Sequence, residues 1–283
     1  MKSLGIFTRQ NNYMAGRLAR WAVTLPPSLY LLIFFLLPAL IVVAASLREP
    51  GEFGGLAPLG GVGGLTLESY RFFFGDTIYL EIFAKSFFIA LLTTVICIAM
   101  AYPLAWLIAR SPKRRRELLV LLVILPFASN LLIRVYAWIL LLGPLNLLYT
   151  PFAVIAGMVY VHLPFMVLPL YVNLATHDLA LLEAAQDLGA GGWTRFWRIT
   201  WPLSLPGIFA GAALVFIPVL GMFAIPELLG GTGDLLIANL IKEQFLDNRD
   251  WPLGAMLSIM LTVAVLALAG LSAWAGKSKG RMA

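Results

Sequence analysis

The sequence is poor in charge, since Asp, Glu, Lys and Arg make up only 12% of its 283 residues. A soluble domain carries about 25% of such residues. The deficit therefore indicates that much of the chain lies in a nonpolar solvent. The 25 glycines and 17 prolines are compatible with this interpretation, because membrane helices tolerate both residues where neighbouring helices satisfy the freed backbone groups.

Cysteine and histidine are almost absent. Cys97 is the single cysteine and lies within an apolar stretch, which excludes an internal disulfide or a multi-cysteine metal site and predicts a buried packing residue. The two histidines, His162 and His177, have no acid or second histidine at metal-ligand spacing. Core packing is therefore favoured over a metal site or a proton relay. No Ser/His/Asp set or zinc constellation indicates an enzyme.

Long apolar runs fill much of the remaining sequence. A hydrocarbon core of about 30 Å needs roughly 20 apolar residues in a helix, and six stretches meet this requirement. They lie at residues 22–46, 84–109, 118–142, 151–172, 207–229 and 253–276. The predicted fold class is therefore all-α, a polytopic membrane protein with six transmembrane helices in a domain of residues 22–276. The first run is too long for a signal-peptide h-region, so we expect an uncleaved helix.

The charges in the connecting segments alternate along the chain. One set of segments is basic, holding Lys2, Arg9, Arg17, Arg20, Arg110, Lys113–Arg116, Arg195, Arg198, Lys277, Lys279 and Arg281. The other set contains most of the acids. Because Lys and Arg mark the cytoplasmic side, the N-terminal segment 1–21 and the tail 277–283 are predicted to be cytoplasmic. The net charge of +6 is thus attributed to topology and not to nucleic-acid binding.

The cytoplasmic connection 173–206 is too long for a helix–helix turn. Apolar residues at helical spacing predict a short amphipathic helix in it, with Asp178 as its cap and Gly189 at its end. A second piece rich in Trp and Arg follows, and we expect Pro202 and Pro206 to stop it before the next span. The residues leave two roles open for this connection. They are an interfacial helix in the lipid headgroups and a docking element for a cytoplasmic partner.

A resemblance favours the docking element. The residues Glu183-Ala184-Ala185, followed by Gly189, Ile199 and Pro202, are similar to the EAA loop of ABC importer permeases, with Trp201 where that family usually has Leu. Four further segments resemble the spermidine/putrescine permeases: LPFASNLLIRVYAW (125–138), YVHLPFMVLPLY (160–171), IPELLGG (225–231) and NRDWPLGA (248–255). The likeness covers most of residues 85–265 and implies a type I ABC importer permease fold.

The resemblance also implies a function and partners. The chain would be half of a polyamine pathway in a bacterial inner membrane, beside a second related permease, two ABC ATPase subunits and an extracytoplasmic substrate-binding protein. The residues expected to dock on the ATPase are Glu183, Ala184, Ala185, Asp187 and Gly189. ATP and Mg would be bound by the ATPases, with no cofactor in this chain. The segment GLSAWAGKS resembles a phosphate-binding loop, but five residues instead of four separate its glycines.

Candidate substrate contacts lie near the expected outer face. Glu227 offers a carboxylate for an ammonium group, and aromatic rings for cation–π contacts are available. These rings belong to Tyr136, Trp138, Tyr160 and Phe223. Arg134 is expected about sixteen residues, roughly 24 Å, along its span. It either reaches the outer headgroups or pairs with Glu227 to hold a gate closed.

The residues alone leave other functions open. A stand-alone secondary transporter of small organic cations would be expected to have a paired repeat, broken helices and intramembrane acids, which the sequence lacks. A membrane-embedded enzyme lacks a catalytic set. The resemblance also leaves the substrate open, since it is equally compatible with an ABC importer permease for an opine-like compound or ferric iron. The pattern Gly207–Gly211 predicts close helix packing and carries no information on chemistry.

Overall fold

The computed structural model describes residues 23–58 and 64–279, with side chains described as far as residue 270. The segment 1–21 and residues 280–283 of the tail, both predicted to be cytoplasmic, lie outside the described residues. The chain divides into two compact units, Phe72–Asp247 and Met1–Arg71 with Asn248–Ala283. Helices, turns and two isolated bridges make up residues 23–58 and 64–279, with no strand among them. The all-α fold class is confirmed.

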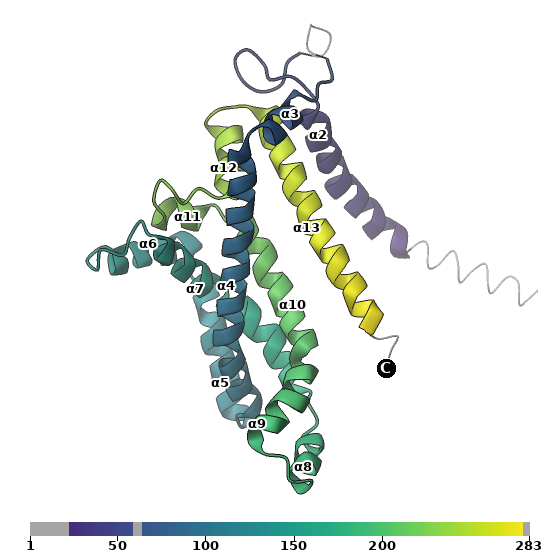
Figure 1. Ribbon diagram of the computed structural model, residues 1–283, viewed down its shortest axis with the longest axis vertical. Helices are drawn as coiled ribbons and strands as arrows, with labels where there is room; N and C mark the ends of the chain where they lie inside the picture. The colour runs from purple at the N-terminus through teal and green to yellow at the C-terminus, as the bar shows by residue number, and fades with distance from the viewer. Residues whose placement is uncertain (1–22, 59–63, 280–283) are drawn as a thin grey trace, which may run out of the picture. The chain divides into compact units, whose positions relative to one another are not determined.

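Three long helices form the core of the unit Phe72–Asp247. They are α4 (Thr77–Arg110), α7 (Pro151–Ala175) and α10 (Trp201–Leu220), and each of them packs against the other two (Figure 1). The helices run alongside one another, so their buried faces meet over several turns. The predicted packing residues lie in this core, since Cys97 and His162 are both buried. The Nδ1 of His162 lies 2.8 Å from the carbonyl oxygen of Met158.

Two glycines of α10 allow it to approach α7 closely. A Cβ on Gly207 would lie 2.6 Å from the Cβ of Asn173. A Cβ on Gly211 would lie 2.6 Å from the Sδ of Met166. Neither position has room for a larger side chain without movement of α7. The close packing predicted from the small-residue pattern is confirmed.

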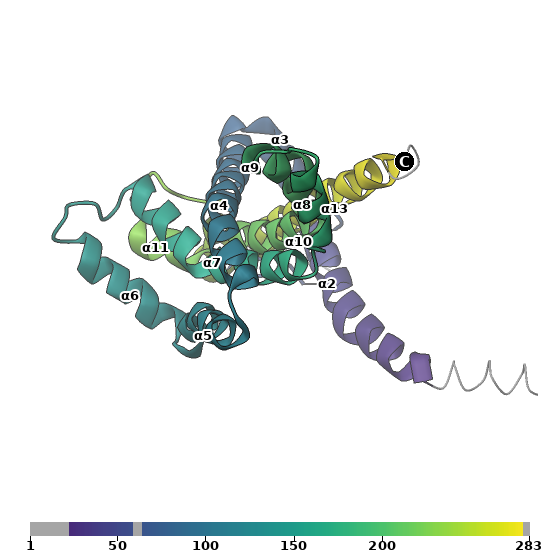
Figure 2. The same ribbon diagram turned by 90° about the horizontal axis from the view of Figure 1, so that it is seen from below.

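The predicted span 118–142 is not one continuous helix. The structure has α5 (Lys113–Ile124), the 3₁₀ turn η2 (Leu125–Ala128) and α6 (Leu131–Leu142), and the axis bends by 92° at the break. Figure 2 shows α5 almost end-on and α6 along its length. Asn130 starts the new helix because its Oδ1 accepts a hydrogen bond from the N–H of Leu132 at 2.8 Å. The expectation that Arg134 lies 24 Å along a straight span is therefore wrong.

The predicted stop at Pro202 and Pro206 is also wrong. Helical backbone runs without a break from Gly192 to Leu220, through α9 (Gly192–Arg195), the π-helical turn η3 (Phe196–Thr200) and α10. Pro202 follows the π-helical turn directly, and its missing N–H leaves one carbonyl of that turn without its helical partner but does not end the helix. The helix ends at Leu220 instead of residue 229, and the short α11 (Ala224–Leu229) follows.

Five helices of the described chain are long and apolar enough to cross a membrane, and the bent pair α5–α6 makes a sixth if it counts as one span. The five are Val23–Ser46, Thr77–Arg110, Pro151–Ala175, Gly192–Leu220 and Trp251–Gly270. The predicted number of spans agrees with this upper count. The first helix includes η1 (Leu32–Leu36) and α2 (Leu37–Ser46), and α2 packs on α13 (Trp251–Lys279) in the unit Met1–Arg71 with Asn248–Ala283. The remaining helices are α3 (Glu68–Gly75), α8 (Ala180–Asp187) and α12 (Ile237–Leu246).

Candidate functional site

The predicted docking residues lie on or directly after α8. Glu183, Ala184, Ala185 and Asp187 belong to this helix. Asp178 caps its start, because its Oδ1 accepts a hydrogen bond from the N–H of Ala180 at 3.0 Å. Both ends of the helix are thus determined by residues next to it in the sequence, as predicted.

The chain reverses direction at Gly189, which has a φ of +80°. Left-handed backbone of this kind costs glycine little and other residues more. It lets the N–H of Gly189 donate to the carbonyl of Gln186 at 2.8 Å, and the N–H of Ala190 to the carbonyl of Ala185 at 2.9 Å. These two bonds satisfy carbonyls that would otherwise be unpaired at the end of the helix.

The connection α8–α9 lies at one end of its unit (Figure 1) and carries exposed apolar side chains. Leu188 is 89% exposed and Trp193 is 75% exposed. Leu181 of α8 and Trp197 are also exposed. Exposed apolar groups gathered on one surface mark a contact with a partner or with lipid. This exposed surface can therefore contact either the lipid headgroups or a cytoplasmic partner, which are the two roles that the sequence left open.

Side-chain contacts join this connection to the core helices. Nη1 of Arg195 donates a hydrogen bond to Oε1 of Gln186 at 2.7 Å, which ties α9 to α8. The rings of Phe196 and Tyr102 meet edge to face with centroids 5.5 Å apart, and the hydroxyls of Tyr102 and Ser204 lie 3.1 Å apart. These contacts connect α8 and α9 with α4 and α10.

A second site lies at the other end of the same unit, between α11 and α12. Nζ of Lys242 lies 2.5 Å from Oε1 of Glu227 and 5.9 Å from the ring centre of Phe223. The Glu227 carboxylate, by accepting this hydrogen bond, raises the pKa of Lys242 above its ordinary value. The pair is partly exposed to solvent, with 28% of the Lys242 side chain and 43% of the Glu227 side chain accessible. The site holds a primary ammonium between a carboxylate and an aromatic face.

The other predicted substrate contacts are only partly brought together. The rings of Trp138 and Tyr160 meet edge to face at 5.7 Å. Tyr136 is 54% exposed. The guanidinium of Arg134 lies 5.9 Å from the ring centre of Phe127. The gate pairing considered for Arg134 is not formed, because Glu227 pairs with Lys242 instead.

Three charged residues of this end were missed by sequence reasoning as site residues: Lys242, Lys85 and Asp234. Nζ of Lys85 lies 3.3 Å from Oδ1 of the buried Asp234 and also donates to the carbonyl of Gly233. The second carboxylate oxygen accepts a hydrogen bond from the N–H of Gly231 at 3.2 Å. These contacts fix the loop between α11 and α12 to α4. The sequence shows only the sign of the charge on each of these residues. It does not show which residues pair, because the paired residues lie far apart in the chain.

Known proteins share both the sequence and the fold of this chain. The sequence profile of the family "Binding-protein-dependent transport system inner membrane component" matches residues 101–277. The chain is 41% identical over 255 residues to the spermidine/putrescine transport system permease protein PotB of Escherichia coli strain K12, covering 83% of this chain and 90% of that protein. The protein of the same name from Haemophilus influenzae is 39% identical over 258 residues, covering 84% of this chain and 87% of that protein.

A solved structure of a bacterial ABC transporter involved in import of the acidic polysaccharide alginate matches with a TM-score of 0.69 at 17% identity, covering 95% of this chain and 99% of that chain. A structure of a bacterial alginate ABC transporter in complex with a periplasmic protein matches with a TM-score of 0.64 at 17% identity, covering 90% of this chain and 93% of that chain. These two matches show the fold.

The break between α5 and α6 is a feature that we expected only of a secondary transporter. The profile and the close relatives outweigh it, because together they extend over most of the chain. The multi-pass helices and the relatives are those of an inner-membrane protein, and the relatives are non-catalytic transport components. The chain thus belongs to the family of binding-protein-dependent transport system inner membrane components, the permease subunits of ABC importers.

Proposed function

We propose that this permease subunit carries polyamines such as spermidine and putrescine through an ATP-driven importer. The observation that carries the substrate class is the setting of the Lys242 ammonium, 2.5 Å from the Glu227 carboxylate and 5.9 Å from the Phe223 ring. A lysine side chain ends in the same primary ammonium as a polyamine does. A site that holds the one has the chemistry to hold the other. The relatives at about 40% identity, which are spermidine/putrescine permeases by name, support the same class.

The same subunit is coupled to ATP hydrolysis through its cytoplasmic connection between α7 and α10. The ATPase subunit docks on α8 and the turn after it, through Glu183, Ala184, Ala185, Asp187 and Gly189. Exposed apolar side chains beside these residues, such as Leu188 and Trp193, support a contact that a partner covers. The hydrogen bond from Arg195 to Gln186 and the contact of Phe196 with Tyr102 then pass the motion of the ATPase to α4 and α10.

This chain forms half of the pathway beside a second related permease, with two ATPase subunits on the cytoplasmic side and an extracytoplasmic binding protein opposite. Both termini are cytoplasmic, and this orientation rests on the basic residues of the segments on that side. The solved alginate importer in complex with a periplasmic protein supports a partner of the last kind.

Uptake of radiolabelled spermidine by cells without other polyamine importers tests the proposal. Cells that express this chain with its partner subunits should accumulate spermidine and putrescine. Glu227→Gln should weaken this uptake, and Glu243→Gln is the matched control because Glu243 of α12 forms no ion pair among the described residues. If the cells accumulated ferric iron or an opine-like compound instead of polyamines, the proposed substrate class would be wrong. The assignment of the chain to an importer would still hold.

A further inference from the structure

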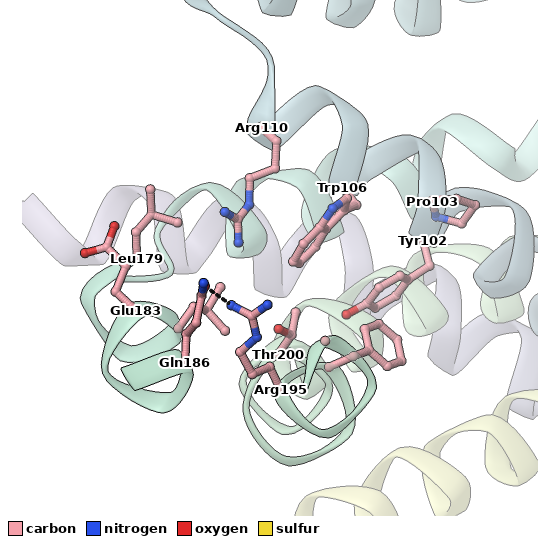
Figure 3. Close-up of a pocket in the computed structure, with 12 residues that line it drawn as sticks. Tyr102, Pro103, Trp106, Arg110, Leu179, Glu183, Gln186, Arg195 and Thr200 are labelled. Atoms are coloured by element: carbon pink, nitrogen blue, oxygen red, sulfur yellow. Dashed lines mark hydrogen bonds between the residues drawn. The ribbon is translucent and has the colours of Figure 1, made fainter. Parts of the chain in front are cut away.

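A cavity of about 630 Å³ lies between the end of α4 and the connection α8–α9. Its lining comes from three places in the chain, since α4 contributes Tyr102, Trp106 and Arg110, α8 contributes Gln186, and the next helical segment contributes Arg195. Figure 3 shows these side chains around the cavity. The lining includes none of the proposed substrate contacts and neither of the exposed side chains Leu188 and Trp193, and Glu183 is the one proposed docking residue that it contains.

Two guanidinium groups face each other across the cavity. In Figure 3, Arg110 points from the end of α4 toward Arg195, and Arg195 points back. The guanidinium of Arg110 lies 4.4 Å from the ring centre of Trp106, and Nη1 of Arg195 is fixed by its hydrogen bond to Gln186. Stacking and hydrogen bonding thus hold both cations in place.

The charge of the two guanidinium groups is not balanced from within the described part of the chain. Neither Arg110 nor Arg195 is in an ion pair there, and the buried Nε of Arg195 has no hydrogen-bond partner. Glu183 is the one acid of the lining, and its carboxylate points away from both guanidinium groups in Figure 3. Like charges that face each other without an acid repel, and a buried N–H without an acceptor costs free energy. An anion between the two guanidinium groups would remove the repulsion between them.

We propose that this cavity binds the phosphate group of an anionic phospholipid. A guanidinium binds phosphate oxygens through two parallel N–H bonds, and two of them facing each other can hold one phosphate from both sides. The lining also offers apolar surface to the first methylene groups of an acyl chain, through Leu179, Leu182 and Phe196. Basic pockets at the ends of membrane helices bind lipid headgroups in this way.

The position of the cavity favours a lipid over a soluble phosphate compound. Arg110 is the last residue of a helix long and apolar enough to span a membrane, and the cavity lies at that end of the helix. Trp and Arg are both common where a membrane helix meets the headgroup layer. A headgroup bound there would contact α4 and α8 together and would hold the coupling connection against the end of α4. The inference does not depend on which solute the importer carries.

Native mass spectrometry of the assembled complex in detergent tests the proposal. The probe lipids are phosphatidylglycerol and cardiolipin, with zwitterionic phosphatidylcholine, whose net charge is zero, as the reference. Arg110→Gln with Arg195→Gln should lower the retention of the anionic lipids by about tenfold, since it removes two charge-assisted contacts. The matched control is Arg114→Gln with Arg115→Gln, which removes the same charge from exposed positions of α5 outside the lining and should leave retention unchanged. Arg110→Lys with Arg195→Lys keeps the charge and should restore part of the binding.

Three outcomes would overturn the proposal. Equal retention in the glutamine variant and the control would show that the lipids bind elsewhere. Quenching of Trp fluorescence by inorganic phosphate that depends on both arginines, with no change in lipid retention, would assign the site to a soluble phosphate compound. Loss of the ATPase subunit from the glutamine variant with lipid retention intact would assign the arginines to an acidic side chain of that partner.

Discussion

The ammonium of Lys242 lies 2.5 Å from Oε1 of Glu227 although the two residues belong to different helices, α12 and α11. The pair therefore bridges the loop between these helices, which the contact of Lys85 with Asp234 fixes to α4. Under the proposed function, Lys242 occupies the place that a substrate ammonium takes during transport. A polyamine that enters must displace it from the carboxylate.

If the substrate displaces Lys242 from Glu227, substitutions of these two residues should change the KM for spermidine in opposite directions. Glu227→Gln should raise the KM for spermidine, by about two- to fivefold for a partly exposed ion pair. Lys242→Met should lower the KM, because the carboxylate is then free when the substrate arrives. Initial rates of uptake at varied spermidine concentration measure both effects. If both variants keep the KM of the Glu243→Gln control, the substrate does not bind at this pair.

The same pair predicts a pH dependence. The pKa of Lys242 is raised in the folded protein by the carboxylate of Glu227. Its contribution to stability is fully present below the ordinary lysine pKa of about 10.5, and it is lost as the pH rises through the raised value. The pair should thus stay formed through the physiological range. In an NMR titration of ¹³C-methylated lysines, the Lys242 signal should titrate above 10.5, and Glu227→Gln should bring it back toward that value.

The sequence was sufficient to predict the number and approximate positions of the spans, because a long apolar run needs no partner to be identified. It was not sufficient to predict where a helix breaks or continues. Pro126 and Pro202 look alike in sequence, yet the chain bends by 92° after the first and stays helical through the second. The difference lies in Asn130, whose side chain starts a new helix, whereas Pro202 follows the π-helical turn η3 within a continuous helix.

The candidate sites were likewise predictable from the sequence only in part. The start and end of α8 were predictable because Asp178 and Gly189 act on backbone groups next to them in the sequence. The partner of Glu227 was not predictable, since Lys242 is fifteen residues away on another helix. That distance depends on the path of the intervening loop, and a sequence pattern carries no information on such a path.

The turn after α8 depends on glycine at one position. Gly189 has a φ of +80°, whereas Gly191 has a φ of −65°. Ala at position 189 should cost roughly 1 kcal/mol of loop stability. Gly189→Pro removes the donor to Gln186 as well and should abolish transport. The proposed docking predicts that both variants lose ATPase from the purified complex, while Gly191→Ala retains it. Full retention in Gly189→Pro would remove this turn from the docking surface.

Close packing of α11 on α7 depends on Gly157. A Cβ there would lie 2.6 Å from Cδ1 of Leu229 and 3.0 Å from Cγ2 of Ile225. Gly157→Ala should therefore destabilise the unit by about 1–3 kcal/mol through overpacking and lower its melting temperature in detergent. Gly233→Ala is the control, because a Cβ at this position meets nothing within 4 Å. If the Gly157→Ala variant and the Gly233→Ala control had equal melting temperatures, α11 would be able to shift without loss of stability.

Purification of the tagged chain with its partners, followed by transport in liposomes, tests the central claim most directly. An ATP-driven polyamine importer requires that a P-loop ATPase and a second permease subunit copurify in stoichiometric amounts. With the binding protein outside, the liposomes should accumulate spermidine only when ATP is supplied to the ATPase side, and Glu183→Lys should stop this accumulation. A chain that purifies alone and moves spermidine without ATP would contradict the importer and identify a secondary transporter.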